Sequence, residues 1–596
     1  MSQLTLLRAS SSLHHVANLL QFQPKYLAYI LYKMPDATKY HSFKIAKRGG
    51  KFRQIDAPCA ELMLLQSKLS DLLQNCIEEI NTNRKFRDQL AHGFKRDHSI
   101  VTNAVKHRRK RHVFNLDLDD FFGTINFGRV RGFFIKDANF MLHPKVATVL
   151  AQIACHQNHL PQGSPCSPVI SNLVGHVLDI HLSRLALKHG CTYSRYADDI
   201  TFSTNKPDFP APIACLVSGQ AHQWKVGQGL EKIVAMAGFT INHEKTRMQY
   251  RGSRQDVTGL VVNKKVNIRT EYRRTVRAMA QHLFLTGQFQ FIQTVADANG
   301  VLTPTKADGT VEQLHGMIGH IDFVDRHNAE MEAKLDSGSY KAKEAANDAL
   351  RSKQRLYRRF LLFKDFYAAP RPMVVCEGKT DNVYLLYAIK HLAANYPKLA
   401  SVSPNNKVKL NIRILRTFES SAGRVLHLAQ GWSGLTGLIE SYLTELLKFK
   451  APKLSHAVIL LVDNDSGGDK IFEKIRRLTK AKPSKTAPYV HVKGNLYVVL
   501  TPLKGGAKQS EIEDCFDDTI KNLNLSGKTF NPDDKADSNL YFSKQILSHY
   551  VRQNAAKIDF TGFADVLDRI TAAIEDYESK VALKVSVAAS TGASNP

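Results

Sequence analysis

The most informative stretch of this sequence is TYSRYADDITFS, residues 192–203. Aromatic and β-branched residues flank its centre on both sides, which predicts two short strands joined by a tight turn. Asp198 and Asp199 stand at that turn. Adjacent carboxylates at the end of a buried hairpin repel each other and need a cation to stay ionised, and Mg²⁺ binds carboxylates together with substrate phosphates. Taken alone, the segment is equally consistent with a solvated turn, because Asp is a common turn residue.

A second acidic strand precedes it in HVFNLDLDDFF, residues 112–122. Here an apolar strand ends in Asp117, and the chain continues into a helical pattern. Two Mg²⁺ ions held by Asp117, Asp198 and Asp199 would activate an attacking 3′-hydroxyl and stabilise a leaving pyrophosphate. Nucleotidyl transfer depends mainly on positioning and charge neutralisation, so these three carboxylates are sufficient for that chemistry.

Two further segments complete this constellation. The stretch LPQGSPCSP, residues 160–168, is a Pro/Gly/Ser loop before a helix, where backbone can approach a base pair or phosphate closely. The stretch GFTINHEKT, residues 238–246, offers Lys245 to protonate pyrophosphate or screen its charge. The alternative for Lys245 is an ordinary surface lysine.

In this order, the four segments resemble the signature blocks of reverse transcriptases, including the Y-x-D-D hallmark and the G-F-x-x-N-x-x-K-T block. The resemblance implies a right hand of fingers, palm and thumb that uses two Mg²⁺ ions and dNTP substrates. It implies that Phe122 is the steric gate beside the sugar 2′ position and that Gln162 and Gly163 lie against the nascent base pair. It also implies that Arg53, on a basic fingers hairpin over residues 47–55, touches the triphosphate.

Two shorter segments resemble blocks of bacterial retron reverse transcriptases: NAVKH, residues 103–107, and VTG, residues 257–259. This resemblance implies a cognate structured non-coding RNA as partner, and as product msDNA, a branched RNA–DNA hybrid primed from a guanosine 2′-hydroxyl. An intron-type reverse transcriptase is the alternative, although the chain has no HNH-like Cys/His cluster. For the arginines among the expected RNA-binding residues, Arg273, Arg274 and Arg277, the alternative is a solvated helix face. The residues expected to bind RNA are Asn103, His107, Val257, Thr258, Gly259, Arg273, Arg274 and Arg277.

A second carboxylate constellation lies in VVCEGKTD, residues 374–381, and ILLVDNDSGG, residues 459–468. Each is an apolar strand that ends in acidic residues, Glu377 in the first and Asp463 and Asp465 in the second. In a parallel sheet both strand ends meet at one edge. These three side chains are therefore expected to hold one or two further Mg²⁺ ions.

This second pattern resembles the TOPRIM domain of topoisomerases, primases and overcoming-lysogenisation-type nucleases. The stretch SEIED, residues 510–514, resembles a later acidic element of the nuclease branch and adds Glu513 as a candidate catalytic residue. The resemblance implies a metal-dependent nuclease fused to the polymerase as its effector, as in one class of retron, with a role in anti-phage defence. The alternatives are a non-catalytic module that binds the branched product and, for Glu513, an exposed helix residue.

With 596 residues, the chain is expected to be multidomain, with an α+β reverse transcriptase followed by an α/β domain built on a small parallel sheet. Residues 1 to about 45 are expected to be helical, Ala333–Ala346 to be a mobile polar connection, and Ala588–Pro596 to fray. The expected domains are 1–111 (N-terminal helices and fingers), 112–262 (palm with the catalytic core), 263–369 (helical basic thumb and connector), 370–520 (TOPRIM-like) and 521–596 (C-terminal extension and frayed tail).

Composition narrows the function classes. A formal net charge of +28 favours polyanionic partners, with a generally basic soluble surface as the alternative. No apolar run approaches the roughly 20 residues that span a bilayer, so no membrane partner is expected. The eight cysteines are scattered without a C-x-x-C pair, which disfavours zinc and disulfide frameworks and fits a bacterial cytoplasm. A homo-oligomer is compatible with the sequence.

Overall fold

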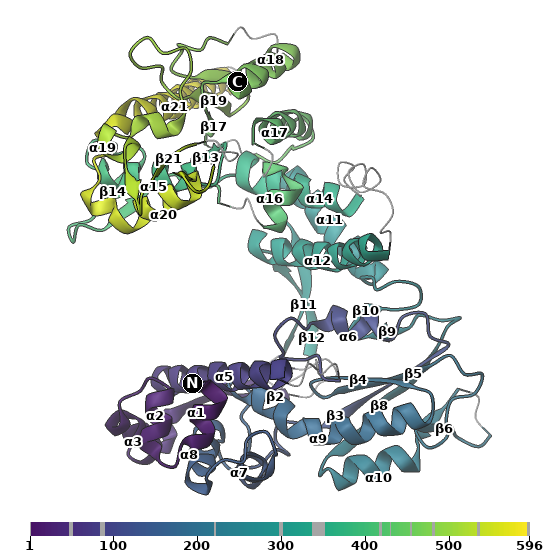
Figure 1. The fold of residues 1–596 in the computed structure, drawn as a ribbon. Coiled ribbons are helices and arrows are strands. Elements are labelled where there is room, and N and C mark those ends of the chain that lie inside the picture. Colours follow the sequence, from purple (N-terminus) through teal and green to yellow (C-terminus); the bar gives the residue numbers. More distant parts are fainter. Residues whose placement is uncertain are drawn as a thin grey trace. The chain divides into compact units, whose positions relative to one another are not determined.

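The structure is a computed structural model. It describes residues 2–46, 52–83, 90–219, 222–296, 302–335, 352–416, 420–428, 431–452, 456–479, 483–532 and 537–592. The chain forms two compact units (Figure 1). The first unit contains residues 1–273, 292–305 and 324–336, and the second contains 274–291, 306–323 and 337–596.

The first unit begins with four helices, α1 (Gln3–Ala9), α2 (Leu13–Leu19), α3 (Pro24–Tyr32) and α4 (Asp36–Lys39). The helical region predicted to reach residue 45 therefore ends at Lys39. Residues 40–46 form strand β1 (Tyr40–Ala46) instead, which pairs antiparallel with β2 (Phe52–Pro58). This pairing supplies backbone partners that local sequence cannot reveal. Residues 47–51 of the predicted fingers hairpin lie outside the described residues.

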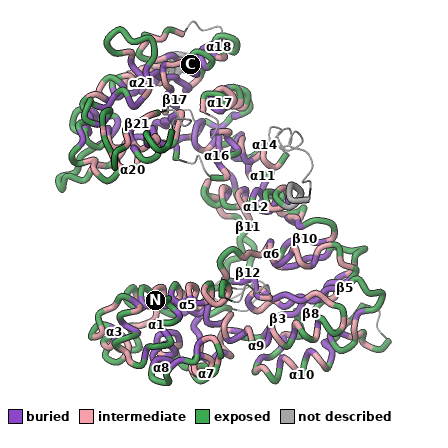
Figure 2. Tube along the Cα trace, in the orientation of Figure 1, coloured by how far each residue is buried: buried purple, intermediate pink, exposed green. Residues whose placement is uncertain are grey.

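A four-stranded antiparallel sheet forms the centre of the first unit. Its order is β4 (Thr192–Tyr196), β5 (Asp199–Thr204), β3 (His112–Asp119) and β8 (Thr240–Tyr250). Strand β3 is buried from His112 to Leu118, as expected for a central strand covered on both faces (Figure 2). Helices α9 (Ser167–Lys188) and α10 (Gln228–Met236) lie on one side and α6 (Ile100–Val105) on the other (Figure 1). The predicted β4–β5 hairpin and the mixed α/β content are confirmed.

Further elements complete the first unit, and four elements contribute residues to both units. The further elements of the first unit are α5 (Ala60–Asn83), α7 (Phe127–Lys136), α8 (Pro144–Ala154), β6 (Ala214–Leu216), β7 (Trp224–Val226), β9 (Asp256–Val257) and β10 (Leu260–Val261). The four elements with residues in both units are α11 (Thr270–Thr286), β11 (Gln290–Ala296), β12 (Leu302–Asp308) and α12 (Val311–Leu335). The paired strands β11 and β12 interrupt the region predicted to be helical. Beyond Leu335, the predicted connection Ala333–Ala346 lies outside the described residues.

The second unit is built on a five-stranded sheet in the order β16 (Arg413–Ile414), β13 (Met373–Cys376), β17 (Val458–Val462), β19 (Leu496–Leu500) and β18 (Val490–Lys493). The first four strands are parallel, as predicted, whereas β18 pairs antiparallel with β19 at the edge. Helices α15 (Asp381–His391), α20 (Lys544–Asn554) and α21 (Ala564–Gly592) share a hydrophobic core with this sheet. Because α21 continues to Gly592, the predicted frayed tail is helical over its first residues.

Other elements of the second unit surround the sheet. They are α14 (Ser352–Leu361), a π-helix (Leu362–Tyr367), β14 (Ala400–Val402), β15 (Val408–Leu410), α16 (Ser421–Val425), α17 (Gly431–Leu446), α18 (Ser466–Thr479), α19 (Asp518–Lys521), β20 (Asn524–Leu525), β21 (Lys528–Phe530) and β22 (Tyr541–Phe542). Short 3₁₀ helices cover Ile512–Cys515, Ala555–Lys557 and Thr561–Phe563. Among the described residues, we find no helix with the length and hydrophobicity of a bilayer-spanning segment.

Candidate functional site

Strand pairing brings the predicted polymerase residues together. Asp117 on β3 is the cross-strand partner of Asp199 on β5, and the Leu118 amide donates to the Asp198 carbonyl at 3.0 Å. On the other side of β3, the register with β8 shifts just before Asp117. From β8, Nζ of Lys245 lies 2.5 Å from Oδ2 of Asp117. Four residues from three separate segments therefore meet at one end of the sheet.

Burial disfavours the charged form of all three carboxyl groups, those of Asp117, Asp198 and Asp199. Burial, reinforced by Asp117 and Asp198, raises the pKa of Asp199 to about 8, and burial also raises the pKa of Asp198. Burial acts in the same direction on Asp117, but hydrogen bonds with Asp199 and Lys245 outweigh it and lower its pKa. One carboxylate with a lowered pKa beside two carboxyl groups with raised pKa values is a set of oxygen donors that Mg²⁺ fits.

The side chains are nevertheless arranged around an ion pair. Within the described part of the chain, no three His, Cys, Asp or Glu side chains form a group arranged to hold a metal ion. In the first unit, Lys245 pairs with Oδ2 of Asp117 at 2.5 Å. Assignment of Asp117, Asp198 and Asp199 as metal ligands therefore stays a prediction that rests on the donor set.

A buried ion pair supports the turn that carries Asp198. Arg195 on β4 and Asp179 on α9 have fully buried side chains, and Arg195 donates Nε and Nη2 to the two Asp179 oxygens, each at 2.7 Å. The same guanidinium donates Nη1 to the Ala197 carbonyl at 3.0 Å. Tyr193 donates its hydroxyl to Asp179 at 2.7 Å. These residues were missed by sequence reasoning, although an arginine in the middle of a buried hairpin strand is a detectable signal.

The residues predicted to contact the nucleotide surround this end of the sheet. Arg53 on β2 lies close enough to Asp198 for its charge to lower the pKa of that carboxyl, against the dominant effect of burial. The Phe122 ring is half-buried beside Phe121. The Gln162 carbonyl accepts from the Asp56 amide at 2.8 Å, which ties the loop to β2. Gly163 has φ +133°, and a Cβ there would lie 2.6 Å from the Asp56 carbonyl oxygen.

The block at residues 103–107 has an internal role in this structure. The His107 ring nitrogens lie 2.7 Å from the Ser203 and Ser194 hydroxyls, and Ser194 donates to Asn103 at 2.6 Å. Asn103 and His107 are fully buried, so neither side chain is exposed in this conformation, and their RNA-binding role stays a prediction. Burial, with nearby Lys106, lowers the pKa of His107 to about 3, which keeps the imidazole neutral.

The second retron-like block packs against the first. Val257 is also fully buried, and its RNA-binding role likewise stays a prediction. Thr258 has φ +46° and donates its hydroxyl to the Ile100 carbonyl on α6 at 3.1 Å. Gly259, with φ +81°, completes the turn between β9 and β10. The predicted RNA-binding arginines differ from these buried residues, since Arg273, Arg274 and Arg277 are exposed on α11.

In the second unit, the predicted carboxylates meet at the carboxyl edge of the parallel sheet. Glu377 follows β13, and Asp463 and Asp465 follow the neighbouring β17. The Asp463 amide donates to Glu377 at 3.4 Å, and Oδ1 of Asp463 accepts from the Ile512 amide at 2.9 Å. Asp465 uses Oδ1 to accept from the amides of Gly467 and Gly468, so it also caps α18.

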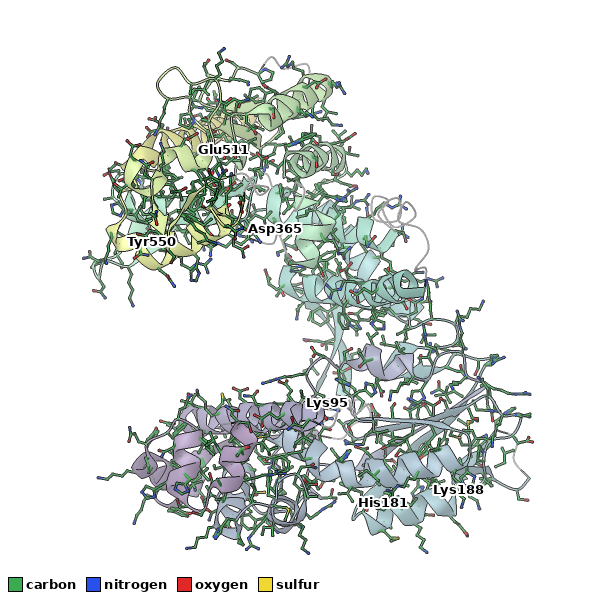
Figure 3. All side chains as sticks on the ribbon, in the orientation of Figure 1. Lys95, His181, Lys188, Asp365, Glu511 and Tyr550 are labelled. Atoms are coloured by element: carbon green, nitrogen blue, oxygen red, sulfur yellow. The ribbon has the colours of Figure 1, made fainter. Side chains whose placement is uncertain are left out.

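Glu513 joins this cluster, together with Lys544, which sequence reasoning missed. Nζ of Lys544, on α20, lies 3.2 Å from Oε2 of Glu513 and 2.9 Å from Oε2 of Glu511. Figure 3 labels Glu511. Burial raises the pKa of Glu377 and of Glu513 to about 7. Oε1 of Glu513 is buried without a hydrogen-bond partner, and an orphaned carboxylate oxygen in an acidic cluster fits a cation.

Asp381 is a further carboxylate in this cluster that was missed. It accepts from the Gly378 amide at 2.7 Å, and its charge raises the pKa of Asp463 further above its ordinary value, after the larger effect of burial. Its signal was present, because Asp381 ends the stretch 374–381. Lys544 lies far along the chain and carried no such signal.

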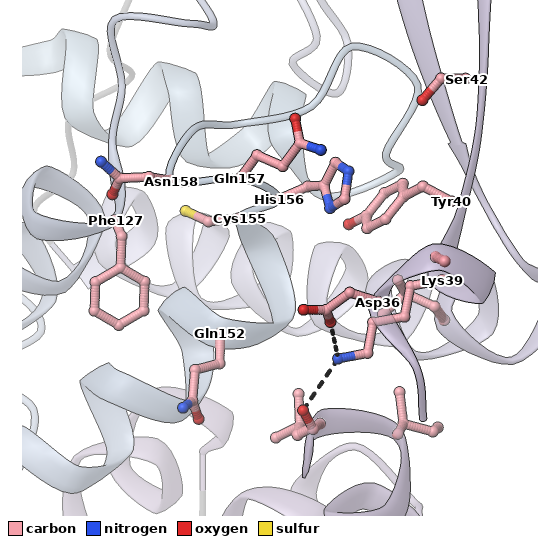
Figure 4. Close-up of a pocket in the computed structure, with 14 residues that line it drawn as sticks. Asp36, Lys39, Tyr40, Ser42, Phe127, Gln152, Cys155, His156, Gln157 and Asn158 are labelled. Atoms are coloured by element: carbon pink, nitrogen blue, oxygen red, sulfur yellow. Dashed lines mark hydrogen bonds and ion pairs between the residues drawn. The ribbon is translucent and has the colours of Figure 1, made fainter. Parts of the chain in front are cut away.

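The first unit also contains a cavity of about 820 Å³ (Figure 4). It is lined by α3, α4, β1 and the end of α8. Its charged residues Asp36 and Lys39 pair with each other at 2.8 Å. None of the predicted site residues lines it, so the cavity gives no support for a catalytic role.

Comparisons with known proteins identify the first unit. The family model described as reverse transcriptase (RNA-dependent DNA polymerase) matches residues 45–279. The retron Mx162 reverse transcriptase of Myxococcus xanthus is 35% identical over 249 residues, which cover 38% of this chain and 48% of that protein. The chain thus spans about half the length of this relative. Apo telomerase from Candida tropicalis aligns over 41% of this chain and 52% of its own with a TM-score of 0.27 and 12% identity, too low to support an argument.

The retron Ec86 reverse transcriptase of Escherichia coli is 31% identical over 249 residues. The matched part covers 41% of this chain and 70% of that relative. Together with the converging Asp117, Asp198, Asp199 and Lys245, this match shows that the chain belongs to the retron reverse transcriptase family.

Proposed function

We propose that the first unit is an RNA-directed DNA polymerase that copies a cognate non-coding RNA into msDNA. The observation that carries the proposal is the convergence of Asp117, Asp199 and Lys245 from three paired strands beside the Asp198 turn. The charge of the chain and the exposed arginines of α11 favour an RNA partner. A bacterial cytoplasm is the proposed location.

The chain's own residues divide the work of nucleotidyl transfer. Asp117, Asp198 and Asp199 would hold Mg²⁺, which, when bound, lowers the pKa of the primer hydroxyl and neutralises the departing pyrophosphate. Lys245, whose Nζ lies 2.5 Å from Asp117, would donate a proton towards the pyrophosphate. Arg53 binds the triphosphate, while Phe122 excludes a ribose 2′-hydroxyl.

The test is primer extension on an RNA template by the full chain, with dNTPs and Mg²⁺. Asp198→Ala should abolish extension, whereas Asp208→Ala, which removes an exposed aspartate elsewhere, should not. Nucleic acid that copurifies with the chain should contain DNA that keeps one branched ribonucleotide after RNase treatment. Linear DNA alone would favour the intron-type alternative. Full extension by Asp198→Ala would refute the assignment.

A second proposed activity is metal-dependent cleavage of nucleic acid by a TOPRIM-like second unit. The observation that favours it is the cluster of Glu377, Asp463 and Glu513 with Lys544, at the sheet edge where parallel α/β folds place their sites. Lys544 would stabilise negative charge that develops on the cleaved phosphate. As a fused effector, such a nuclease fits a role in anti-phage defence.

Two variants separate this proposal from the alternative of a non-catalytic binding module. Glu377→Ala should remove Mg²⁺-dependent cleavage of RNA or DNA and leave primer extension intact. If cleavage is never observed with the wild-type chain, the binding module is favoured. If the msDNA restrains the nuclease, Asp198→Ala should change toxicity in cells that express the chain with its RNA, and unchanged toxicity would refute restraint.

A further inference from the structure

Phe94 combines an exposed ring with a strained backbone close to the polymerase site. Its side chain is 43% exposed, and its φ of +57° lies in the left-handed region that residues with a Cβ rarely adopt. Backbone strain of this kind concentrates at sites that bind or turn over ligands.

Neighbouring residues fix this strained conformation. The Gly93 carbonyl accepts from the Asn172 side-chain amide at 2.6 Å, and the Phe94 carbonyl accepts from Gln74 at 3.2 Å. Gly93 has no room for a side chain, because a Cβ there would lie 2.7 Å from the Ala197 amide nitrogen. The segment is therefore clamped directly beside the turn that carries Asp198.

The Phe94 ring contacts two aromatic residues of the site. Its centroid lies 6.2 Å from that of Phe122 in an edge-on arrangement and 6.4 Å from that of Tyr196. Phe122 is the proposed gate beside the sugar of the incoming dNTP, and Tyr196 begins the turn at which the primer terminus would lie. A ring that touches both thus borders the space of the nascent base pair.

We propose that the exposed face of Phe94 packs against the nascent base pair and so helps to align the primer terminus with Asp198. This inference rests on the proposed polymerase function. An aromatic ring tolerates every template sequence, because each base offers a π-face. The need for a fixed ring at this place explains why a phenylalanine occupies a backbone conformation that would suit glycine better.

The test uses Phe94→Gly in the full chain, because glycine relieves the strain and removes the ring. A contact role predicts a Tm no lower than that of the wild type and a kcat/KM for dNTP lowered at least about fivefold, the loss expected for one base–aromatic stack. Phe94→Tyr, which keeps an aromatic ring at this position, should have the kcat/KM of the wild type. Tyr26→Ala, which removes an exposed aromatic side chain on α3, should leave it unchanged.

Two results would overturn the proposal. If Phe94→Gly has the kcat/KM of the wild type, the ring makes no contact with the nascent base pair that matters for the reaction. If Phe94→Gly lowers Tm and activity in proportion, the ring serves to pack the protein. Wild-type chain and Asp198→Ala are assayed in parallel. If the wild type fails to extend the primer, the polymerase proposal itself fails, and the inference about Phe94 fails with it.

Discussion

The buried pair of Arg195 and Asp179 allows the sharpest prediction about the catalytic turn. Asp179→Asn keeps the shape of the side chain but leaves the Arg195 charge without its counter-ion. Both side chains have no exposure to solvent, so solvent does not screen the loss. Breaking such a pair costs about 3–5 kcal/mol, which corresponds to a fall in Tm on the order of 10 °C. Calorimetry of the full chain measures the fall in Tm. A loss of unfolding free energy smaller than about 1 kcal/mol would refute the prediction.

A second variant separates stability from the positioning of the turn. Asp179→Leu, Arg195→Met and Tyr193→Phe together replace the buried polar network with apolar groups, a change that is often close to neutral for stability. The Ala197 carbonyl then loses its donor, so the turn that carries Asp198 is less well fixed. Misplacement by about 1 Å can cost on the order of a hundredfold in rate. We expect near-wild-type Tm with primer extension lowered at least about tenfold, and wild-type extension by this variant would refute the positioning role.

Three further substitutions test neighbouring features. Gly93→Ala places a Cβ 2.7 Å from the Ala197 amide nitrogen, so it should cost about 1–3 kcal/mol and lower primer extension, whereas Gly132→Ala in open space should be harmless by both measures. The unfolded chain protonates His107 near pH 6.5 but the folded chain only near pH 3, so stability falls as the pH drops through this window. This loss amounts to about 2 kcal/mol at pH 5, and urea titrations of His107→Gln should lack it. Lys245→Met should lower kcat about 10²–10⁴-fold with Tm nearly unchanged, since that side chain is 55% exposed, and an unchanged kcat would contradict its role as acid.

Much of the polymerase site was predictable because its signals are local. Asp117 lies near the end of an apolar strand, and Asp198 and Asp199 lie at the turn of a short hairpin. Ordered spacing of the segments then brought Asp117, Asp198, Asp199 and Lys245 together in the prediction, as strand pairing does in the structure. The same reasoning located Glu377 beside Asp463, because both follow neighbouring parallel strands.

The features that sequence reasoning missed depend on partners far along the chain. Arg195 is stable inside the protein only because Asp179 reaches it from α9. Lys544 reaches the second cluster from a helix near the C-terminus. The β11–β12 pair was missed for a different reason. Its β-branched residues were a usable signal, but the surrounding basic helices dominated the interpretation of that region.

The two retron-like blocks make hydrogen bonds inside the protein in this structure. His107 bridges Ser194 on β4 and Ser203 on β5, so it ties together both strands of the hairpin whose turn holds Asp198. Thr258 fastens the second block to the helix of the first. Substitutions here should therefore weaken RNA binding only as far as they loosen the hairpin. A His107 variant that loses RNA affinity at unchanged Tm would require a contact that this conformation does not provide. Parallel losses of RNA affinity and Tm would instead support a role of the motif in holding the shape of this hairpin.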